Sequence, residues 1–511
     1  MCLARIATNP ACLEREAKTL LDCRTCLSPE TAMYDTGVIP AAGAGLRLHP
    51  YTENTAKPLL EIGGKSLLQR NLEIMRDQLG VRRVILITGH LGQQIQDAFG
   101  DGSALGLKLE YVPCHNVEAG LARGLYQIRD RIHGPFPVIL GDELYLNAGH
   151  KGLARLPFEH YNAVCGIKIT GDTTLIKRNY AVELDGNRIR SLTEKPRVVN
   201  NNYLGCGSYV FTPRIFDYIE RTPPSSRTGR VELTDAIDLM AREQQGVYAV
   251  TLTGGYSNIN TPNDFRGATY LYRKTHFHEY RTSLVIPAYE EAASIGHVLE
   301  EFSGLVDEIV VADNQSEDCT AEIARQHGAR VISRAFPGYG SALKQAMDEA
   351  SGDILILVEA DASFSPDDLP KILEYLKDAD MVVGTRTTRQ MIEQGANMDF
   401  FLRWGNVLAA KVLQILWIRQ EPRFTDLGCT YRGLWKDAWL AMRDRLSQSG
   451  PAFSPEMMVE MLRLNGKIIE IPVTYRPRIG GVSKHSRGVT DILRTGFQML
   501  WLILRRRFGM R

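Results

Sequence analysis

Two glycines, an arginine and a lysine stand near the start of the chain in a spacing that suits phosphate binding. Gly43 and Gly45 follow a short β-rich run at 37–41. Glycines after a strand let successive backbone N–H groups surround phosphate oxygens without a Cβ atom in the way. Arg47 and Lys57, the latter before a proline, add permanent positive charge. An ordinary strand–helix turn is the alternative, but the ordered cations favour a phosphate-binding loop.

A carboxylate follows the β-rich run 136–140, where Asp142 stands directly after a glycine. Ligands of parallel sheets gather at the carboxyl ends of the strands, and a carboxylate at that edge can bind Mg²⁺ carried by phosphate. Capping a helix is the alternative role for Asp142. The glycine-rich segment is not the dinucleotide-binding fingerprint, because Arg47 and Leu48 stand where that fingerprint needs a third glycine.

Acidic residues follow three buried-looking runs in the second half of the chain, at 284–287, 310–312 and 354–358. Each acid alone could be an ordinary loop residue. Three successive parallel strands, however, would bring the carboxylates to one edge of a sheet, where they can hold a ribose, a base and a metal-bound diphosphate. The acids concerned are Glu290, Glu291, Asp313, Glu359 and Asp361.

These residues need sheets to position them. Short β-rich runs alternate with helical periodicity from residue 36 to about 270, and the alternation restarts at residue 283. This rhythm predicts an α/β fold with two consecutive doubly wound, mostly parallel sheets. The expected parts are an N-terminal extension at 1–35, a first domain at 36–272, a linker at 273–281, a second domain at 282–489 and a basic amphipathic helix at 490–511.

Composition narrows the class of protein. The 511 residues are 44% hydrophobic and 23% charged, as in soluble globular proteins. The formal charge of +1 argues against a bulk electrostatic nucleic-acid binder. No apolar run reaches the roughly 18 residues of a membrane span, and no signal-peptide core is visible, so we expect a cytoplasmic protein. The early Cys23 and Cys26 are spaced poorly for zinc with the other cysteines, which favours free thiols.

The segment 41–68 resembles the sugar nucleotidyltransferases, which join a nucleoside triphosphate to a sugar 1-phosphate. The resemblance extends over about 36–270, through Gly141-Asp142, Glu194-Lys195-Pro196, the run 205–213 and the segment 258–262. The family likeness implies that the triphosphate is held by Gly43, Gly45, Arg47 and Lys57, that Asp142 binds Mg²⁺ or Mn²⁺, and that Lys195 meets the phosphate of the second substrate.

Two positions depart from the pattern of that family. Asn258 stands where many relatives carry a second metal-binding Asp, and an amide oxygen binds Mg²⁺ more weakly than a carboxylate. The segment 114–122, where relatives read the base, matches both the sugar branch and the polyol or phosphonate branch only loosely. The base and the sugar or alcohol therefore stay open.

The second half resembles glycosyltransferase family 2, and within it the polyprenyl-phosphate glycosyltransferases typified by dolichol-phosphate mannosyltransferase. The resemblance covers about 282–490 and continues through 383–386, 425–432 and 478–484. It implies that the nucleotide is bound by Pro287, Tyr289, Glu291 and Asp313, the metal by Glu359 and Asp361, the acceptor phosphate by Arg386 and Arg432, and the diphosphate by Arg478, Ser483 and Lys484. The family usually has Asn at position 290 and Asp at position 359.

The last residues suggest contact with a membrane surface. From Lys484 onward seven cations stand against one acid, a net charge of +6. An apolar stretch with Trp501 and flanking arginines predicts a helix in the headgroup layer of an anionic membrane. A second candidate is 400–418, where Phe401, Val412, Leu416 and Trp417 would face lipid. The alternative is that both helices pack on the core or on a partner subunit in a homo-oligomer.

The sequence thus predicts a bifunctional enzyme on the inner face of the cell membrane. One half would make a nucleotide sugar from a nucleoside triphosphate and a sugar 1-phosphate or related phosphorylated alcohol. The other would transfer a glycosyl group from a nucleotide sugar to a polyprenyl phosphate with inversion. A phosphate acceptor is already anionic, so its attack needs orientation more than a strong base. A soluble acceptor, or a catalytically inactive binding module in one half, are the alternatives.

Overall fold

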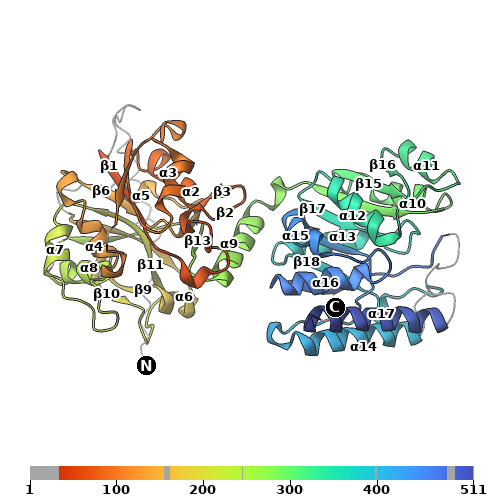
Figure 1. Ribbon diagram of the computed structural model, residues 1–511. Coiled ribbons are helices and arrows are strands. Elements are labelled where there is room, and N and C mark those ends of the chain that lie inside the picture. The colour runs from red at the N-terminus through yellow and green to blue at the C-terminus, as the bar shows by residue number, and fades with distance from the viewer. Residues whose placement is uncertain are drawn as a thin grey trace, which may run out of the picture. The chain divides into compact units, whose positions relative to one another are not determined.

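The computed structural model (Figure 1) describes residues 34–114, 116–154, 161–243, 246–396, 400–479 and 489–509. The chain divides into two compact units between Thr269 and Tyr270, and each unit is described here by itself. Positions 1–33 of the predicted N-terminal extension, with Cys23 and Cys26, lie outside the described residues. Ser483 and Lys484 also lie outside them.

A nine-stranded mixed sheet forms the centre of the first unit, counted over its described residues. The strands β5, β4, β1 and β6 run parallel, and β11 runs antiparallel between β6 and β8. Val38 and Ile39 of β1 are fully buried, as expected for a strand covered on both faces. The strands, in sheet order, are β5 (Lys108–Pro113), β4 (Arg83–Thr88), β1 (Thr36–Ala41), β6 (Phe136–Ile139), β11 (Tyr203–Phe211), β8 (Ala163–Ile169), β12 (Val247–Thr251), β10 (Arg188–Glu194) and β9 (Tyr180–Asp185).

Helices and two small hairpin sheets complete the first unit. Helix α2 begins where the Ser66 hydroxyl accepts a hydrogen bond from the Gln69 N–H at 3.1 Å, and its apolar face packs in the core. The small sheets pair β7 (Glu143–Leu146) with β13 (Gly255–Asn258) and β2 (Glu61–Ile62) with β3 (Lys65–Ser66). The helices are α2 (Leu67–Asp77), α3 (Gly92–Phe99), α4 (Leu121–Tyr126), α5 (Lys151–Ala154), α6 (Thr173–Arg178), α7 (Ile215–Arg221), α8 (Leu233–Arg242) and the start of α9 (Pro262–Thr275).

The second unit has the same construction around a seven-stranded sheet, again as far as the structure describes it. Here β16, β15, β14 and β17 run parallel, and β19 is antiparallel between β17 and β18. The strands, in sheet order, are β16 (Arg330–Ser333), β15 (Glu308–Asp313), β14 (Thr282–Ala288), β17 (Ile354–Leu357), β19 (Arg432–Trp435), β18 (Met381–Thr385) and β20 (Ile468–Pro472). The predicted α/β fold with parallel strands is confirmed, although the antiparallel strands make both sheets mixed.

The helices of the second unit include a pair, α14 and α17, that lie side by side (Figure 1). Arg506 of α17 pairs with the buried Glu456 and Glu460 of α16, which fixes α17 to the core. Trp417, predicted to face lipid, is buried instead, with the Arg507 guanidinium 5.2 Å from its ring. The helices are α10 (Ile295–Phe302), α11 (Thr320–Gln326), α12 (Tyr339–Glu349), α13 (Leu369–Leu376), α14 (Phe400–Leu416), α15 (Lys436–Met442), α16 (Phe453–Arg463) and α17 (Val489–Phe508).

The end of α9 is built into the second unit, in the segment 273–281 that the sequence predicts to be a linker. Arg273 is only 3% exposed. Its guanidinium pairs with Asp380 at 3.1 Å and with Asp437 at 2.8 Å, and lies 4.2 Å from the Trp435 ring. None of the described helices is long and apolar enough to span a membrane.

Candidate active sites

The glycine-rich loop after β1 lines a pocket of about 710 Å³. Gly45 has a φ of +64°, the left-handed region that favours glycine, and its carbonyl accepts a hydrogen bond from the Thr52 hydroxyl at 2.7 Å. A Cβ atom at Gly43 would meet no protein atom within 4 Å apart from its chain neighbours, so this position borders open space. The loop therefore borders a pocket with room for a ligand, and its role in phosphate binding stays a prediction.

Both predicted cations of the first site reach one asparagine side chain. Lys57 is 8% exposed, and its Nζ lies 2.5 Å from Asp142 Oδ2 and 3.1 Å from Asn260 Oδ1. Arg47 Nη2 donates to the same Asn260 oxygen at 3.3 Å. Asn260 lies in the segment 258–262 that carries the family resemblance, but the sequence predicted no role for it. Its central position depends on the fold, which brings residues more than 200 positions apart into contact.

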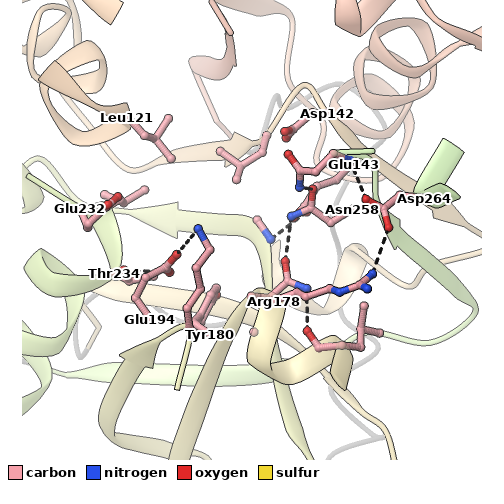
Figure 2. Close-up of a pocket in the computed structure, with 18 of the residues that line it drawn as sticks. Leu121, Asp142, Glu143, Arg178, Tyr180, Glu194, Glu232, Thr234, Asn258 and Asp264 are labelled. Carbon is pink, nitrogen blue, oxygen red and sulfur yellow. Dashed lines mark hydrogen bonds and ion pairs between the residues drawn. The ribbon is translucent and has the colours of Figure 1, made fainter. Parts of the chain in front are cut away.

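A second pocket of about 540 Å³ adjoins the first (Figure 2). In Figure 2, Asp142 and Asn258 lie toward one end of this pocket, and Glu194 and Glu232 lie toward the other. A molecule in one pocket can therefore meet a molecule in the other beside the Asp142 carboxylate. The residues that line both pockets are Arg47, Leu121, Leu140, Asp142 and Asn260.

Lys195 lines the second pocket from a strained backbone position. Its φ is +47°, and its N–H donates to the Asn179 carbonyl at 2.7 Å. The Lys195 ammonium lies 3.5 Å from Glu194 Oε1, and burial raises the pKa of that carboxyl. A cation and a carboxylate thus stand together where the second substrate was predicted to bind.

The two predicted metal ligands of the first site come from neighbouring segments. Asn258 lies opposite Glu143 in the β7–β13 pair, and Glu143 directly follows Asp142. Asn258 Oδ1 accepts from Asn260 Nδ2 at 2.5 Å, and its own amide donates to Asn179 Oδ1 at 2.8 Å. One carboxylate and one amide oxygen are hard donors of the kind that Mg²⁺ takes together with water and phosphate oxygens. The donor set therefore fits the predicted metal.

A buried carboxylate that the sequence analysis did not single out lies behind Asp142. Glu143 is 2% exposed, and burial, with the charge of Asp142 adding to it, raises its pKa to about 7. Its oxygens accept hydrogen bonds from Tyr145, from Tyr256 at 2.7 Å and from the Gly207 N–H at 2.8 Å. No local motif marks this role, because it depends on partners from three strands.

In the second unit, the ends of β14 and β15 carry the predicted nucleotide-binding residues. Asp313 is 1% exposed, and its carboxylate accepts from the Ser316 hydroxyl at 2.5 Å and the Ser333 hydroxyl at 2.6 Å. Glu291 accepts from Ser294 at 3.0 Å just before α10. Pro287 lies near the end of β14, and Tyr289, directly after it, is 40% exposed.

The two predicted metal carboxylates of this unit share one arginine. Arg478 lies 3.2 Å from Glu359 Oε2 and 2.9 Å from Asp361 Oδ2. Burial, together with the Asp361 charge, raises the pKa of Glu359 to about 7. The Thr430 hydroxyl donates to the other oxygen of Glu359 at 2.7 Å. The structure thus brings together residues that the sequence assigned to the metal and to the diphosphate.

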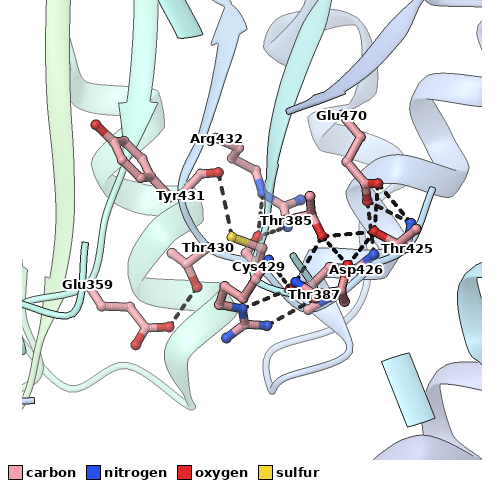
Figure 3. A network of polar contacts seen from close by, with 12 residues as sticks. Glu359, Thr385, Thr387, Thr425, Asp426, Cys429, Thr430, Tyr431, Arg432 and Glu470 are labelled. Atoms are coloured by element: carbon pink, nitrogen blue, oxygen red, sulfur yellow. Dashed lines mark hydrogen bonds and ion pairs between the residues drawn. The ribbon is translucent and has the colours of Figure 1, made fainter. Parts of the chain in front are cut away.

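The two arginines predicted to receive the acceptor phosphate have different surroundings (Figure 3). Arg386 is 9% exposed and forms a two-pronged ion pair with Asp426, at 2.8 and 3.0 Å. Arg432 is fully buried in β19 and donates to the carbonyls of Cys429 and Ser454. Arg432 therefore stabilises the loop 425–431 from inside the core in this structure. Arg386 is the more exposed of the two arginines.

A second carboxylate missed by the sequence analysis holds the same loop. Glu470 of β20 accepts from the N–H groups of Thr425 and Asp426 at 2.8 and 2.9 Å and from the Thr425 hydroxyl at 2.8 Å (Figure 3). Burial raises the pKa of Glu470 to about 7. Because Asp426 in turn pairs with Arg386, Glu470 stabilises the loop that holds Arg386.

Comparison with known proteins separates the chain into two regions. Residues 36–275 match the nucleotidyl transferase family, and residues 283–417 match glycosyl transferase family 2. The resemblances predicted from the motifs are thereby confirmed at the family level.

Similar curated proteins come from Haloferax volcanii. The low-salt glycan biosynthesis nucleotidyltransferase Agl11 is 30% identical over 46% of this chain and 65% of its own length. The UTP–glucose-1-phosphate uridylyltransferase AglF is 29% identical over 44% and 92%. The low-salt glycan biosynthesis hexosyltransferase Agl6 is 32% identical over 40% and 50%. The chain thus spans less than two thirds of the length of Agl11 and half that of Agl6.

A solved structure of UDP-glucose pyrophosphorylase with UDP-glucose aligns with 47% of this chain and 99% of its own, at 23% identity and a TM-score of 0.42. The first family match ends at residue 275, where α9 ends, and the second begins at residue 283. Each match covers strands of only one of the two large sheets. The chain thus joins a region that matches the nucleotidyl transferase family, at residues 36–275, to a region that matches glycosyl transferase family 2, at residues 283–417.

Proposed function

We propose that the first unit transfers a nucleotidyl group from a nucleoside triphosphate to a sugar 1-phosphate or a related phosphorylated alcohol. The adjoining pockets carry this proposal, because they share Arg47 and Asp142 where two phosphate-bearing substrates would meet. The glycine-rich loop would hold the triphosphate, and Lys195 would hold the phosphate of the second substrate.

The chemistry needs positioning and charge neutralisation more than a covalent step. An oxygen of the sugar phosphate attacks the α-phosphorus. The bond from this phosphorus to the β-bridging oxygen breaks, and pyrophosphate leaves with the electron pair. Arg47 and Lys57 stabilise the charge that builds on the phosphates. Asp142 and Asn258 would hold a magnesium ion, which supplies further charge neutralisation when bound.

A panel of triphosphates and phosphate monoesters tests the first activity. UTP and glucose 1-phosphate come first, because AglF is named for them, and other bases, sugars and polyol phosphates follow. We expect magnesium-dependent pyrophosphate release that needs both substrates. Release by no pair, or release that persists in an Asp142→Asn variant, would contradict the proposal.

We further propose that the second unit transfers a glycosyl group from a nucleotide sugar to a polyprenyl phosphate. The acids after β14, β15 and β17 gather at one sheet edge and support binding of a metal-bound nucleotide diphosphate there. The acceptor oxygen attacks the anomeric carbon, and the bond from that carbon to the diphosphate breaks, so direct displacement inverts the centre. Arg386 would orient the acceptor phosphate, while Glu359 and Asp361 would hold the metal.

An apolar face on α14 and α17 supports a lipid acceptor. Trp404, Leu408 and Ile415 are each more than half exposed and share one face of α14, since they are spaced by four and seven residues. Phe497, Trp501 and Phe508 have the same spacing on α17 and are 70, 48 and 64% exposed. Exposed cations flank this face and match an anionic bilayer: Lys411, Arg494, Arg505 and Arg507.

Vesicle flotation decides between a membrane and a partner subunit. We expect the full chain to float with vesicles that contain anionic lipid, and a Phe497→Glu, Trp501→Glu variant to stay in the dense fraction. The exposed Tyr375→Glu, on α13, is the matched control and should float like the parent chain. A dimer that dissociates in the α17 variant, without flotation of the parent, would favour the homo-oligomer instead. Flotation would support peripheral binding to an anionic membrane surface, as we propose for the inner face of the cell membrane.

The acceptor is tested by extraction. With a labelled nucleotide sugar and a short polyprenyl phosphate, we expect label in the organic phase, and none with an Asp361→Asn variant. Label that stays in the aqueous phase, attached to an added soluble acceptor, would support the alternative. A unit that fails every assay although its partner unit works would be an inactive binding module.

A further inference from the structure

We infer that Glu143 and Tyr256 are positioning residues that hold Asp142 and Asn258 in one frame. This inference rests on the proposed nucleotidyl transfer, because the frame acts through the metal which that reaction would use. Glu143 is among the residues that line the second pocket, but its carboxylate oxygens accept hydrogen bonds from Tyr256 and from the Gly207 N–H, so we assign it a positioning role. The role of Glu143 and Tyr256 is to fix the distance between two oxygen donors that come from different strands.

The Glu143 carboxylate joins three strands at one buried point. Glu143 belongs to β7 and directly follows Asp142. Its Oε1 accepts from the Tyr256 hydroxyl of β13 at 2.7 Å, and its Oε2 accepts from the Gly207 N–H of β11 at 2.8 Å. A Cβ atom at Gly207 would lie 2.8 Å from the Glu143 carboxyl carbon, so the strands approach as closely as glycine permits. The small β7–β13 sheet is thus tied to the large sheet.

Tyr256 connects Glu143 to the strand of the second proposed metal ligand, Asn258. It lies two residues before Asn258 on β13. In the register of the pair, Asn258 is opposite Glu143 and Tyr256 is opposite Tyr145. A two-stranded sheet is marginally stable alone, so its backbone hydrogen bonds hold this register only weakly. The buried bond between Tyr256 and Glu143 adds a fixed contact between the strands that carry the donors.

Helix α2 holds the same turn from another direction. Asn71 is fully buried, and its side-chain amide donates to the Leu140 carbonyl at 3.2 Å and to the Glu143 carbonyl at 3.1 Å. These two carbonyls stand on either side of Asp142. The backbone that carries Asp142 is therefore held by Asn71, while the neighbouring side chain is held by β11 and β13.

Groups that orient metal ligands commonly contribute about 10- to 100-fold to metal affinity. Two tyrosines provide a matched pair to test this here. Tyr145 and Tyr256 are both buried, and both donate to Glu143. Tyr145 lies on β7 with Glu143 itself, whereas Tyr256 connects Glu143 to β13. Loss of the Tyr256 hydroxyl should therefore weaken metal binding far more than loss of the Tyr145 hydroxyl.

The experiment measures Mn²⁺ binding by the free-ion electron paramagnetic resonance signal. The full chain carries Glu359→Gln and Asp361→Asn, so that the second unit contributes no site, and Asp142→Asn in that background gives the baseline. We expect Tyr256→Phe to raise the Mn²⁺ dissociation constant about 10-fold, and Tyr145→Phe to leave it within about twofold. Both variants should lose similar thermal stability. If Tyr256→Phe fails to fold, Glu143→Gln, which keeps the volume, should weaken Mn²⁺ binding in its place.

Equal effects of the two tyrosine variants on Mn²⁺ binding, or none, would overturn the inference, because the hydroxyl would then be only structural. So would Mn²⁺ binding that Asp142→Asn leaves unchanged. The proposed function fails separately: a chain that binds Mn²⁺ through Asp142 but releases no pyrophosphate would refute the activity, while the tyrosine pair would still decide the frame.

Discussion

In each unit a carboxylate assigned to a metal pairs with a cation assigned to a phosphate. Lys57 lies 2.5 Å from Asp142, and Arg478 lies 2.9 Å from Asp361. A metal-bound phosphate would bring an anion for each cation and a cation for each carboxylate. When the substrate binds, the phosphate would replace the carboxylate as the partner of the cation, and the metal would replace the cation as the partner of the carboxylate. Each charge would therefore keep a partner of opposite sign. The same residues can thus be stable before and after a substrate binds.

Replacing Lys57 by alanine tests this role. The Lys57→Ala variant should release pyrophosphate about 10²- to 10³-fold more slowly, because one fixed cation at the transferring phosphate is lost. Glycosyl transfer by the same chain should be unchanged. Lys65→Ala is the matched control, since Lys65 pairs with Glu73 at 2.9 Å and its side chain is 44% exposed. A similar loss in both variants would show a general effect on folding.

Glu470 gives a prediction for stability against pH. Its pKa is about 7 in the folded chain, above the usual value of 4.5, because of burial. The folded state therefore binds more protons than the unfolded state between about pH 4.5 and 7, and this residue's contribution to stability falls as the pH rises through that window. A Glu470→Gln variant lacks this contribution. The free energy of unfolding of the variant, minus that of the parent, should therefore rise from pH 5 to pH 7.

Tryptophan fluorescence during urea unfolding measures the effect in the second unit alone, because all five tryptophans lie between 404 and 501. A difference between variant and parent that stays constant with pH would contradict the raised pKa of Glu470. Asp378→Asn, at an exposed carboxyl with a distant cation, serves as the control and should show no such trend.

At the first site, the sequence predicted which residues meet at the pocket where a local motif marks them. Gly43, Lys57 and Asp142 meet at one pocket as the spacing indicated. Glu143 and Glu470 were missed, because burial and hydrogen-bond partners from distant strands give them their roles. A strand pattern also does not reveal which polar side chains point into the core. The burial of Arg432 was therefore not predicted.

At the level of elements, the alternation of strands and helices predicted the parallel parts of both sheets. It did not reveal that β11 and β19 run antiparallel, since strand direction is set by long-range pairing. The apolar periodicity also located α14 and α17. Which residues on them are exposed depends on packing between the two helices, so the prediction that Trp417 is exposed was wrong, while contact of Trp501 with lipid stays a prediction.

The burial of Arg273 at the end of α9 could not be predicted from the sequence pattern. The charged segment after 273 was read as a linker, yet Arg273 is buried between Asp380, Asp437 and the Trp435 ring. Arg273→Met should destabilise the second unit by about 3 kcal/mol, because the partly buried Asp380 loses its cation. Urea unfolding followed by tryptophan fluorescence measures the change.

The neighbouring Lys274→Met is the control for this variant. Lys274 pairs with Asp378 at 3.6 Å, and both side chains are more than half exposed. Exposed pairs contribute about 0–1 kcal/mol, so this variant should unfold nearly like the parent. Equal unfolding of both variants would mean that the Arg273 contacts add nothing to the second unit.

For the whole molecule, the two proposed reactions form a sequence if the nucleotide sugar made by the first unit is the donor for the second. Two variants of the full chain, Lys57→Ala and Asp361→Asn, each keep one working unit. Neither alone should convert a triphosphate, a sugar 1-phosphate and a polyprenyl phosphate into glycolipid. Mixed together, they should form glycolipid after a lag in which the nucleotide sugar accumulates, because a released intermediate can reach the other chain. A mixture in which each half-reaction runs in its own assay, yet no glycolipid forms, would mean that the first product is not the donor of the second step.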